Sequence, residues 1–173
     1  QREAVEFPPR ATHLGASALK FGRATRLSFV VTKPPASAIV AAMLKLLFLG
    51  DIVGEPGRRA VIETVPKWRE ERGIDFVIVN GENSANGRGI TPKICTDLLR
   101  ARIAVITSGD HIWDQKDIIP HLDIEPRLLR PLNYPPATPG RGSIVLETPK
   151  GKVAVINVQG RTFMQPPLEN PFL

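Results

Sequence analysis

Three short apolar runs constrain what this chain can fold into. The middle run, Phe76–Val79, is unbroken and rich in β-branched residues. Such a run is typical of a strand buried on both faces, as in a parallel sheet with helices on each side. The other two runs are Leu44–Leu49 and Ile103–Thr107, and helical patterns separate all three. This β-α-β-α-β order predicts right-handed crossovers and parallel strands, so we expect an α/β fold.

Polar side chains with metal-binding chemistry follow each apolar run directly. The carboxyl ends of parallel strands meet at one edge of a sheet, and ligands bind at that edge in open α/β folds. Oxygen and imidazole groups that converge in this way suit divalent metal ions. We therefore expect a metal site formed by Asp51, Glu82, Asn83, Asp110 and His111.

Each of these residues also has a simpler interpretation. Asp51 follows a glycine, where a helix N-cap or a turn residue is common. Glu82 ends a buried strand and needs a partner, which either an arginine or a metal could supply. If it bridged two ions, they would clamp a phosphate and activate a water molecule. His111, beside them, could protonate a leaving alkoxide.

Several other polar or aromatic residues have less specific patterns. Arg88 lies in a loop with two glycines, where a phosphate contact and a plain flexible loop are equally compatible with the sequence. We expect Trp113 in the core or a cleft wall, and His121 on a solvated helix face. Cys95 is the single cysteine, so an intrachain disulfide is excluded, and its apolar helical context predicts a buried structural thiol. These features favour a reducing, cytoplasmic location.

Helix signals separate the strands. The first helix has Pro56 in its first turn and is expected to end at Gly73. Thr91 followed by Pro92 predicts an N-cap and first helical position, and that helix is expected to reach about Arg102.

The remaining chain predicts an addition to the parallel sheet. Asp114 is expected to cap a short helix that runs through Ile119. Prolines then indicate a long loop over residues 126–140. Two further strands, Ser143–Thr148 and Val153–Val158, flank a turn signal and predict a hairpin. We expect this hairpin to make the sheet mixed.

The first 42 residues differ from the rest of the chain. They contain scattered prolines without a sustained period, and the first methionine is Met43. We expect residues 1–42 to be a disordered extension outside the fold, with a transit peptide as the competing interpretation. Six basic and two acidic residues in this stretch carry most of the net charge of +6. The charge is therefore a weak argument for polyanion binding by residues 43–173, and no run is long enough to suggest a membrane partner.

Motifs at the three strand ends resemble one family. The segments Gly50–Gly54, Asn80–Asn83 and Gly109–Asp114 are similar to those of the bacterial YmdB-type metallophosphoesterases. These enzymes are 2′,3′-cyclic-nucleotide 2′-phosphodiesterases of the calcineurin-like superfamily. Further similar segments are Arg130–Pro135, Thr138–Gly140 and Asn157–Met164. The resemblance runs from Met43 to the end of the sequence.

The resemblance implies a fold, a cofactor and a substrate class. It implies a mixed β-sandwich flanked by helices, with two divalent metal ions, typically iron or manganese. Asp51 and Asn83 would hold one ion, Glu82 would bridge both, and Asp110 would hold the second. His111 would be the proton donor. The implied partner is a cyclic nucleotide or a related phosphodiester, with RNA as a possible substrate, and no oligomeric state is implied.

Two features depart from the family pattern. The family has asparagine where this chain has Asp110, which adds a negative charge next to the expected phosphate and could alter metal preference or slow the reaction. The family's remaining metal ligands are histidines in a C-terminal half, whereas the histidines here are His13, His111 and His121. We therefore expect the sequence to be the N-terminal part of a metallophosphoesterase domain, a fragment with weak or no activity.

Two rival functions remain at this point. The same strand-end rim suits a non-catalytic, nucleotide- or RNA-binding α/β regulator, for which Asp110 and the missing histidines would be signs of lost catalysis. A Rossmann dinucleotide domain is a weaker third possibility. The segment Gly50–Gly54 lacks the Gly-x-Gly-x-x-Gly spacing that lets the backbone approach a pyrophosphate.

Overall fold

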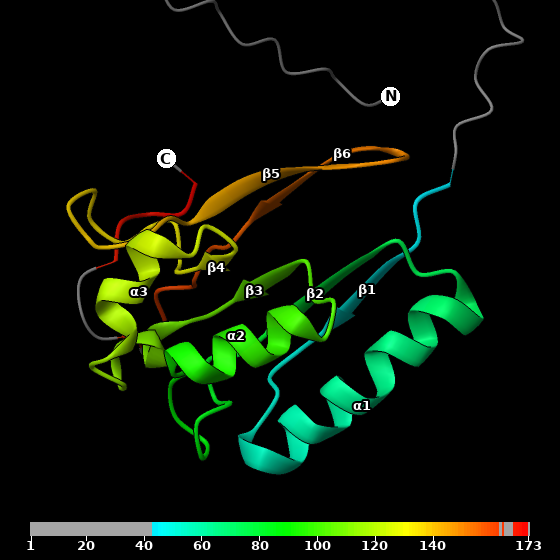
Figure 1. Ribbon diagram of the computed structural model, residues 1–173. Helices are drawn as coiled ribbons and strands as arrows, with labels where there is room; N and C mark the ends of the chain where they lie inside the picture. Colours follow the sequence, from blue (N-terminus) through cyan, green and yellow to red (C-terminus); the bar gives the residue numbers. More distant parts are fainter. Residues whose placement is uncertain (1–42, 163, 165–167, 173) are drawn as a thin grey trace, which may run out of the picture. The chain divides into compact units, whose positions relative to one another are not determined.

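The computed structural model describes residues 43–162, 164 and 168–172. The expected disordered extension, residues 1–42, lies outside these described residues. Figure 1 shows the order of elements along the chain. They are β1 (Leu46–Leu49), α1 (Gly54–Arg72), β2 (Phe76–Asn80), α2 (Pro92–Arg100), β3 (Val105–Thr107), η2 (a 3₁₀ helix, Asp110–Trp113), α3 (Ile118–Ile124), β4 (Leu128–Leu129), β5 (Ser143–Thr148) and β6 (Gly151–Ile156).

The first four strands form a parallel sheet in the order β1-β2-β3-β4. The register aligns Leu49 with Val79, and Asn80 with Thr107, so the strands end at a common edge. This arrangement confirms the parallel α/β prediction. The first and third expected strands were two residues too long at their amino ends, and the second lacked Asn80 at its carboxyl end. The short strand β4 was not predicted, because two residues carry too little periodicity to detect.

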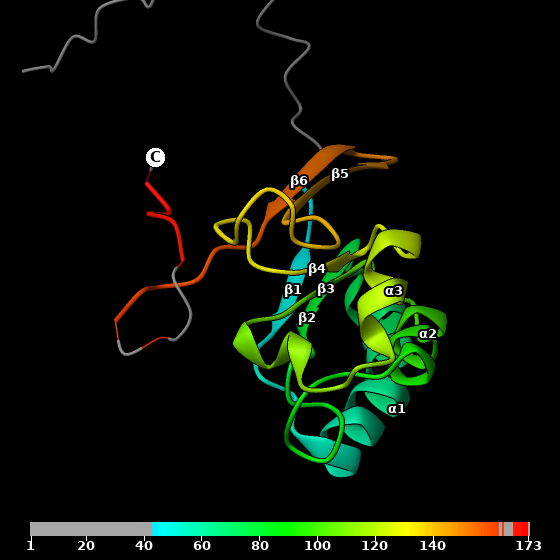
Figure 2. The ribbon, with the colours of Figure 1, turned by 90° about the vertical axis from the view of Figure 1, so that its left-hand side faces the viewer.

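All three α-helices cover one face of the parallel sheet (Figures 1 and 2). A single buried cluster joins α1, α2 and α3 to that face, with Val65, Leu98 and Leu122 as representatives from the three helices. The expectation of helices on each side of the sheet was therefore wrong. Strand β2 is buried on both faces as predicted, but a different layer covers its other face.

That second layer is the hairpin β5-β6, which forms its own two-stranded antiparallel sheet. Val155 of β6 packs with Phe76, Ile78 and Leu129 in a second buried cluster. Figure 2 shows the hairpin on the side opposite the helices. The hairpin was predicted, but it stacks on the parallel sheet and does not extend it. The described part is thus an α/β sandwich with the helices on one outer face, which confirms the predicted fold class.

The helix ends follow the predicted capping signals in two of three cases. Gly73 ends α1 with a left-handed φ of 62°, which costs glycine little. The Thr91 side chain accepts a hydrogen bond from the backbone N–H of Ile94, 3.3 Å away, at the start of α2. The third prediction was wrong, because Asp114 follows the 3₁₀ helix η2 and α3 begins only after Asp117.

None of the helices in the described ranges combines the length and apolarity that crossing a bilayer requires. The single cysteine is fully buried on α2, as predicted for a structural thiol. Burial raises the pKa of the Cys95 thiol to about 12, so the thiolate that would act as a nucleophile is suppressed.

Candidate functional site

The loops after β1, β2 and β3 begin at the same edge of the parallel sheet, and backbone hydrogen bonds tie them together. The N–H of Ile52 donates to the carbonyl of Asn80, at 3.1 Å, and the N–H of Gly54 donates to the carbonyl of Asn83, at 2.9 Å. The N–H of Gly81 donates to the carbonyl of Thr107, at 2.9 Å. The strand-end residues predicted as a site therefore lie on loops that are hydrogen-bonded to one another.

Asp51, Asn83 and His111 form a chain of side-chain hydrogen bonds across these loops. Asn83 Nδ2 donates to Asp51 Oδ1 at 2.6 Å, and Asn83 Oδ1 lies 2.6 Å from His111 Nδ1. The carboxylate can only accept, so the amide oxygen must face the imidazole, and His111 must carry its proton on Nδ1. His111 Nε2 is then the ring nitrogen that points away from Asn83.

Asp51 is held in an unusual backbone conformation. Its φ is 42°, in the left-handed region that a non-glycine residue rarely adopts. The N-cap of α1 is Val53, so the helix-cap interpretation of Asp51 does not apply. A left-handed backbone fixed beside a charged hydrogen-bond chain is typical of functional sites, where such strain is retained.

Glu82 is a half-buried carboxylate next to the negatively charged Asp110. Burial raises its pKa, and the charge of Asp110 raises it further, while a hydrogen bond from Asn80 opposes them. Asn80 Nδ2 lies 3.4 Å from Glu82 Oε1. Among the described residues, none of the ion pairs involves Glu82. The arginine alternative is therefore unsupported there, and the partners of this carboxylate are the side chain of Asn80 and the backbone of His111.

Gly109 makes room for Glu82. A Cβ at this position would overlap the Glu82 carboxylate. Asp110 and His111 follow on η2, with His111 Nε2 3.9 Å from Asp110 Oδ2. Segments after two different strands thus meet where the Glu82 carboxylate packs against the Gly109 backbone, and a larger residue at position 109 would displace that carboxylate.

The five predicted residues are connected pairwise, but they do not form a compact ligand cluster. In the described part of the chain, His, Cys, Asp and Glu side chains do not gather in groups of three or more close enough to hold a metal ion. Asn83 supplies an additional oxygen with two lone pairs, one of which accepts the hydrogen bond from His111. The donor set fits a divalent ion in kind, but the described residues do not complete a metal site.

The glycine loop at residues 84–90 is pinned to the segment after η2. Arg88 Nε lies 2.9 Å from Asp114 Oδ2, and Gln115 Nε2 donates to the Arg88 carbonyl at 2.9 Å. The plain flexible loop is therefore not what the structure contains. The phosphate contact of Arg88 stays a prediction, because its guanidinium is mostly exposed but already paired.

An aromatic pair that the sequence reasoning did not combine lies beside the site. Trp113 ends η2 and packs edge-on against Tyr134, with ring centroids 5.4 Å apart. This confirms Trp113 as a core residue. The indole N–H of Trp113 and the hydroxyl of Tyr134 are buried and have no hydrogen-bond partner among the described residues. Burial raises the pKa of Tyr134, the adjacent side chain of Trp113 opposes this, and the charges of Asp110 and Glu82 raise it further.

Two polar residues brace the site and were also missed as individual positions. The buried Arg130 side chain donates to backbone carbonyls, including those of Pro131 at 2.8 Å and Thr138 at 3.2 Å. Asn157 Nδ2 donates to the carbonyl of Ser108 at 2.6 Å, just before Gly109. The signal that could have found them is the family-like segments that contain them. By contrast, His121 was expected on a solvated face, but it is half-buried and its Nε2 is fully covered.

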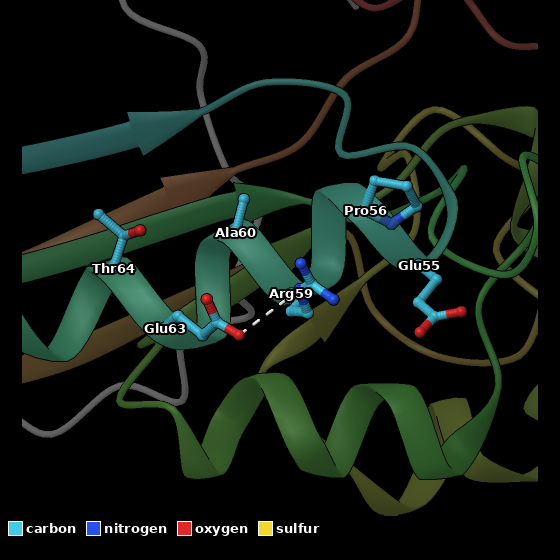
Figure 3. A pocket seen from close by; sticks show the side chains of 6 residues that line it. All are labelled: Glu55, Pro56, Arg59, Ala60, Glu63 and Thr64. Carbon is cyan, nitrogen blue, oxygen red and sulfur yellow. Dashed lines mark ion pairs between the residues drawn. The ribbon is translucent and has the colours of Figure 1, made fainter.

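A hollow on the outer face of α1 does not belong to the candidate site. Figure 3 shows its lining, with an ion pair between the exposed side chains of Arg59 and Glu63 at 3.5 Å. It is lined by Glu55, Pro56, Arg59, Ala60, Glu63 and Thr64. It contains none of the strand-end residues, and its side chains are those of an ordinary solvated helix face.

The sequence of the chain matches the model of a known protein family. The family model described as "YmdB-like protein" matches residues 47–173. The chain belongs to the YmdB-like family. It is 47% identical to the 2′,3′-cyclic-nucleotide 2′-phosphodiesterase of Bacillus subtilis, over 75% of this chain and 49% of the relative. It is 34% identical to a putative phosphatase/phosphodiesterase of Mycoplasma pneumoniae, over 75% of this chain and 48% of the relative.

Solved structures support the same membership. A hypothetical protein from Thermus thermophilus matches with a TM-score of 0.67 and 41% identity, covering 73% of this chain and 49% of that one. A phosphatase from Mycoplasma pneumoniae matches with a TM-score of 0.68 and 34% identity, covering 75% of this chain and 48% of that one. The chain thus spans about half the length of the relatives that it matches.

Proposed function

We propose that this chain carries the strand-end part of the active site of a metal-dependent phosphodiesterase that acts on 2′,3′-cyclic nucleotides or related phosphoesters. The observation that carries the proposal is the convergence of Asp51, Asn83 and His111 in one hydrogen-bond chain, beside the carboxylates of Glu82 and Asp110. The name of the Bacillus subtilis relative supports the substrate class. The single buried thiol supports a cytoplasmic location.

The resemblance to the metallophosphoesterases implies a role for each side chain. Asp51 and Asn83 would hold one divalent ion, Glu82 would lie between two ions, and Asp110 would hold the second. Iron or manganese is the proposed metal, as the resemblance to the metallophosphoesterases implies, and carboxylate and amide oxygens suit manganese. When bound, two such ions clamp a phosphate and lower the pKa of a water molecule that attacks it.

The proton needed by the leaving group is assigned to His111. Its Nδ1–H is fixed on Asn83, so the ring orientation is set and Nε2 is the atom that can hold a proton for the leaving alkoxide. Asp51 orients Asn83 from the other side and thereby acts on the imidazole indirectly.

Asp110 gives this site a more negative charge than an asparagine would. Burial raises the pKa of Glu82 and the charge of Asp110 raises it further, so a nearby cation would offset the repulsion between the two carboxylates. The added charge also lies where a phosphate would approach. We expect tighter binding of the metal than with asparagine, but slower turnover.

The direct test is hydrolysis of 2′,3′-cyclic AMP by the purified chain with Mn²⁺. We expect little or no turnover by the 173-residue chain, because its described part lacks a group of three or more His, Cys, Asp or Glu ligands. Turnover at an ordinary enzymatic rate, on the order of 1–10³ per second, that is abolished in Asp51→Ala would contradict this expectation. It would show that the site works as it stands.

A non-catalytic nucleotide- or RNA-binding regulator is the second candidate. The incomplete donor set and Asp110 favour it, since a binding module does not require a complete pair of metal sites. The two candidates differ in their metal requirement. Nucleotide binding that persists unchanged in excess EDTA would favour the regulator, and binding that requires Mn²⁺ would favour the phosphodiesterase.

A further inference from the structure

A hollow lies at the amino-terminal edge of the parallel sheet, the edge opposite the candidate site. Phe76 at the start of β2, Ala104 just before β3 and Arg127 just before β4 line it, together with the end of β5. Its volume is about 390 Å³, which is in the range of pockets that hold small ligands. The strand-end residues of the candidate site do not line it. The hollow is therefore a separate feature of the described chain.

Two arginines meet in this hollow although their charges repel each other. Arg69 from the last turn of α1 and Arg102 from the turn after α2 both line it. Arg69 Nη1 donates a hydrogen bond to the backbone carbonyl of Arg102 at 3.1 Å. Burial lowers the pKa of Arg69, the charge of Arg102 lowers it further, and the charge of Asp75 opposes them. An anion bound beside the two guanidinium groups would offset this repulsion.

Arg69 is also the arginine of the hollow that lacks a counter-ion. Arg102 Nη1 lies 3.2 Å from Glu70 Oε1, and Arg127 Nε lies 2.8 Å from Glu125 Oε1. Among the described residues, by contrast, Arg69 takes part in none of the ion pairs. Charged groups that are taken out of water are normally paired. A half-buried guanidinium without a counter-ion therefore favours the binding of an external anion.

The two carboxylates that line the hollow are already engaged by lysines. Asp75 Oδ2 accepts hydrogen bonds from Lys150 Nζ and from the backbone N–H of Lys45, both at 2.8 Å. Glu147 Oε1 lies 3.2 Å from Lys152 Nζ. Because each acidic group of the lining has a cation of its own, the positive charge of Arg69 stays in excess.

The guanidinium of Arg69 is held in position and keeps further donors. Its Nη1 and Nη2 donate to the backbone carbonyls of Arg102 and Asp75, at 3.1 and 3.0 Å. Its Nε is covered and has no hydrogen-bond partner among the described residues. A guanidinium carries two N–H groups on each Nη, so each Nη keeps a second N–H that can donate to an anion. A planar guanidinium fixed in this way matches the geometry of a phosphate group.

Apolar side chains make up much of the remaining lining, among them Leu99, Ile103, Leu146 and Pro149. An inorganic anion gains nothing from such a wall, whereas an organic phosphate can bury its carbon skeleton against it. We infer that the hollow binds a small organic phosphate of the size of a nucleoside monophosphate, with its phosphate group on Arg69 and Arg102. This binding site does not depend on the proposed function, because it shares no residue with the strand ends.

Calorimetric titration with AMP in excess EDTA tests this site, because EDTA removes any metal ion that could hold the phosphate at the strand ends. We expect saturable binding of AMP by the 173-residue chain, and weaker binding of both adenosine and inorganic phosphate. Arg69→Gln should weaken AMP binding at least about 10-fold, because charge-assisted hydrogen bonds are lost. Arg59→Gln is the matched control and should bind AMP as the parent chain does, since Arg59 also lies on α1 but is exposed and paired with Glu63.

Hydrogen exchange of the parent chain gives a readout that does not depend on a variant folding. AMP should increase the protection of the amides of residues 102–104 and 146–148 and leave that of residues 81–83 unchanged. Protection confined to residues 81–83, or the absence of saturable binding at millimolar AMP, would overturn the inference. Equal AMP affinities of Arg69→Gln and Arg59→Gln would also overturn it. Inorganic phosphate that binds as tightly as AMP would contradict an organic ligand, because the apolar wall would then contribute nothing.

Discussion

Gly109 is the single residue on which the position of Glu82 depends most directly. Gly109→Ala would place a methyl group in the space that the Glu82 carboxylate occupies. Glu82 would have to move, and we expect Mn²⁺ affinity to fall at least 10-fold, the range that misplaced ligand support usually costs. Isothermal titration measures it. Gly160→Ala is the matched control, because no atom of the described residues lies within 4 Å of a Cβ there. Equal affinities in the two variants would contradict the assigned role of Glu82.

Tyr134 is the residue at the site whose role the sequence did not indicate. Its buried hydroxyl lies close enough to Asp110 and Glu82 for their charges to raise its pKa. Tyr134→Phe keeps the ring packed on Trp113 and removes only the hydroxyl. We expect Mn²⁺ affinity to change by severalfold while the Tm stays within about 2 °C. A large fall in Tm without a change in affinity would show a purely structural role.

At the scale of residues, sequence reasoning placed the strand-end groups well and the supporting groups poorly. Asp51, Glu82 and Asp110 could be predicted at one rim because topology alone brings parallel strand ends together. Arg130 and Tyr134 could not, because their contacts arise from a long loop without periodicity. His121 was misplaced for a similar reason, since the faces of a short helix cannot be told apart before its start is known.

The N-cap of α2 is a local contribution to stability that can be measured separately. Thr91→Ala removes the side-chain acceptor for the Ile94 N–H, and we expect the free energy of unfolding to fall by about 1 kcal/mol. Urea denaturation measures it. Thr91→Ser should retain most of the stability, because the hydroxyl is preserved. A serine variant as unstable as the alanine variant would show that the threonine methyl group, and not the cap, is responsible.

Asp75 links the start of β2 to the hairpin turn. Lys150 Nζ lies 2.8 Å from Asp75 Oδ2, and the backbone N–H of Lys45 donates to the same oxygen at 2.8 Å. The hydrogen bond from Lys150 is the main cause that lowers the Asp75 pKa. Because the pKa is lowered in the folded state, the ionised Asp75 carboxylate stabilises the fold. This stabilisation is fully present above the unfolded pKa of about 3.9 and is lost as the pH falls through the folded pKa.

Asp75→Asn should therefore lower the Tm at pH 7, and the difference from the parent chain should shrink towards pH 2. Calorimetry at the two pH values measures it. Glu63→Gln, in an exposed ion pair on α1, is the control and should change the Tm little at either pH. A Tm difference between Asp75→Asn and the parent chain that stays constant with pH would show that ionisation of Asp75 does not contribute to stability.

At the scale of elements, the predictions succeeded where local signals are strong. Gly73 and the Thr91-Pro92 pair fixed helix ends because capping chemistry is local. The short 3₁₀ helix and β4 were missed, because they span only a few residues and are held by tertiary contacts such as the hydrogen bond from Ile106 N–H to the Arg127 carbonyl. The hairpin was found but assigned to the wrong sheet, since pairing partners depend on the whole fold.

Cys95 reports on the integrity of the whole core between the sheet and the helices. Its thiol is fully buried, and burial raises its pKa to about 12. We expect no reaction with Ellman's reagent over an hour in native buffer and complete reaction within minutes in about 6 M urea. Rapid native labelling, with an unchanged Tm, would show that the helical layer opens far more easily than this packing implies.

At the scale of the whole molecule, the family and the α/β class could be predicted from the strand-end motifs. The sandwich of a parallel sheet and a hairpin layer was expected only from the family resemblance. The pattern of apolar residues in a strand does not show which element packs against that strand. The exposed face of β1 was not anticipated at all. Its apolar side chains look like core residues in the sequence, and only the width of the hairpin layer leaves them uncovered.

Mn²⁺ binding by the 173-residue chain, followed by electron paramagnetic resonance, tests the proposed metal site most directly. We predict weak, saturable binding by the parent chain, lost in Glu82→Gln. Glu63→Gln is the control, because Glu63 is an exposed carboxylate on α1 away from the strand ends, and binding should be unchanged in it. Binding that is equal in both variants, or absent in the parent chain at millimolar Mn²⁺, would contradict the claim that the strand ends form a metal site.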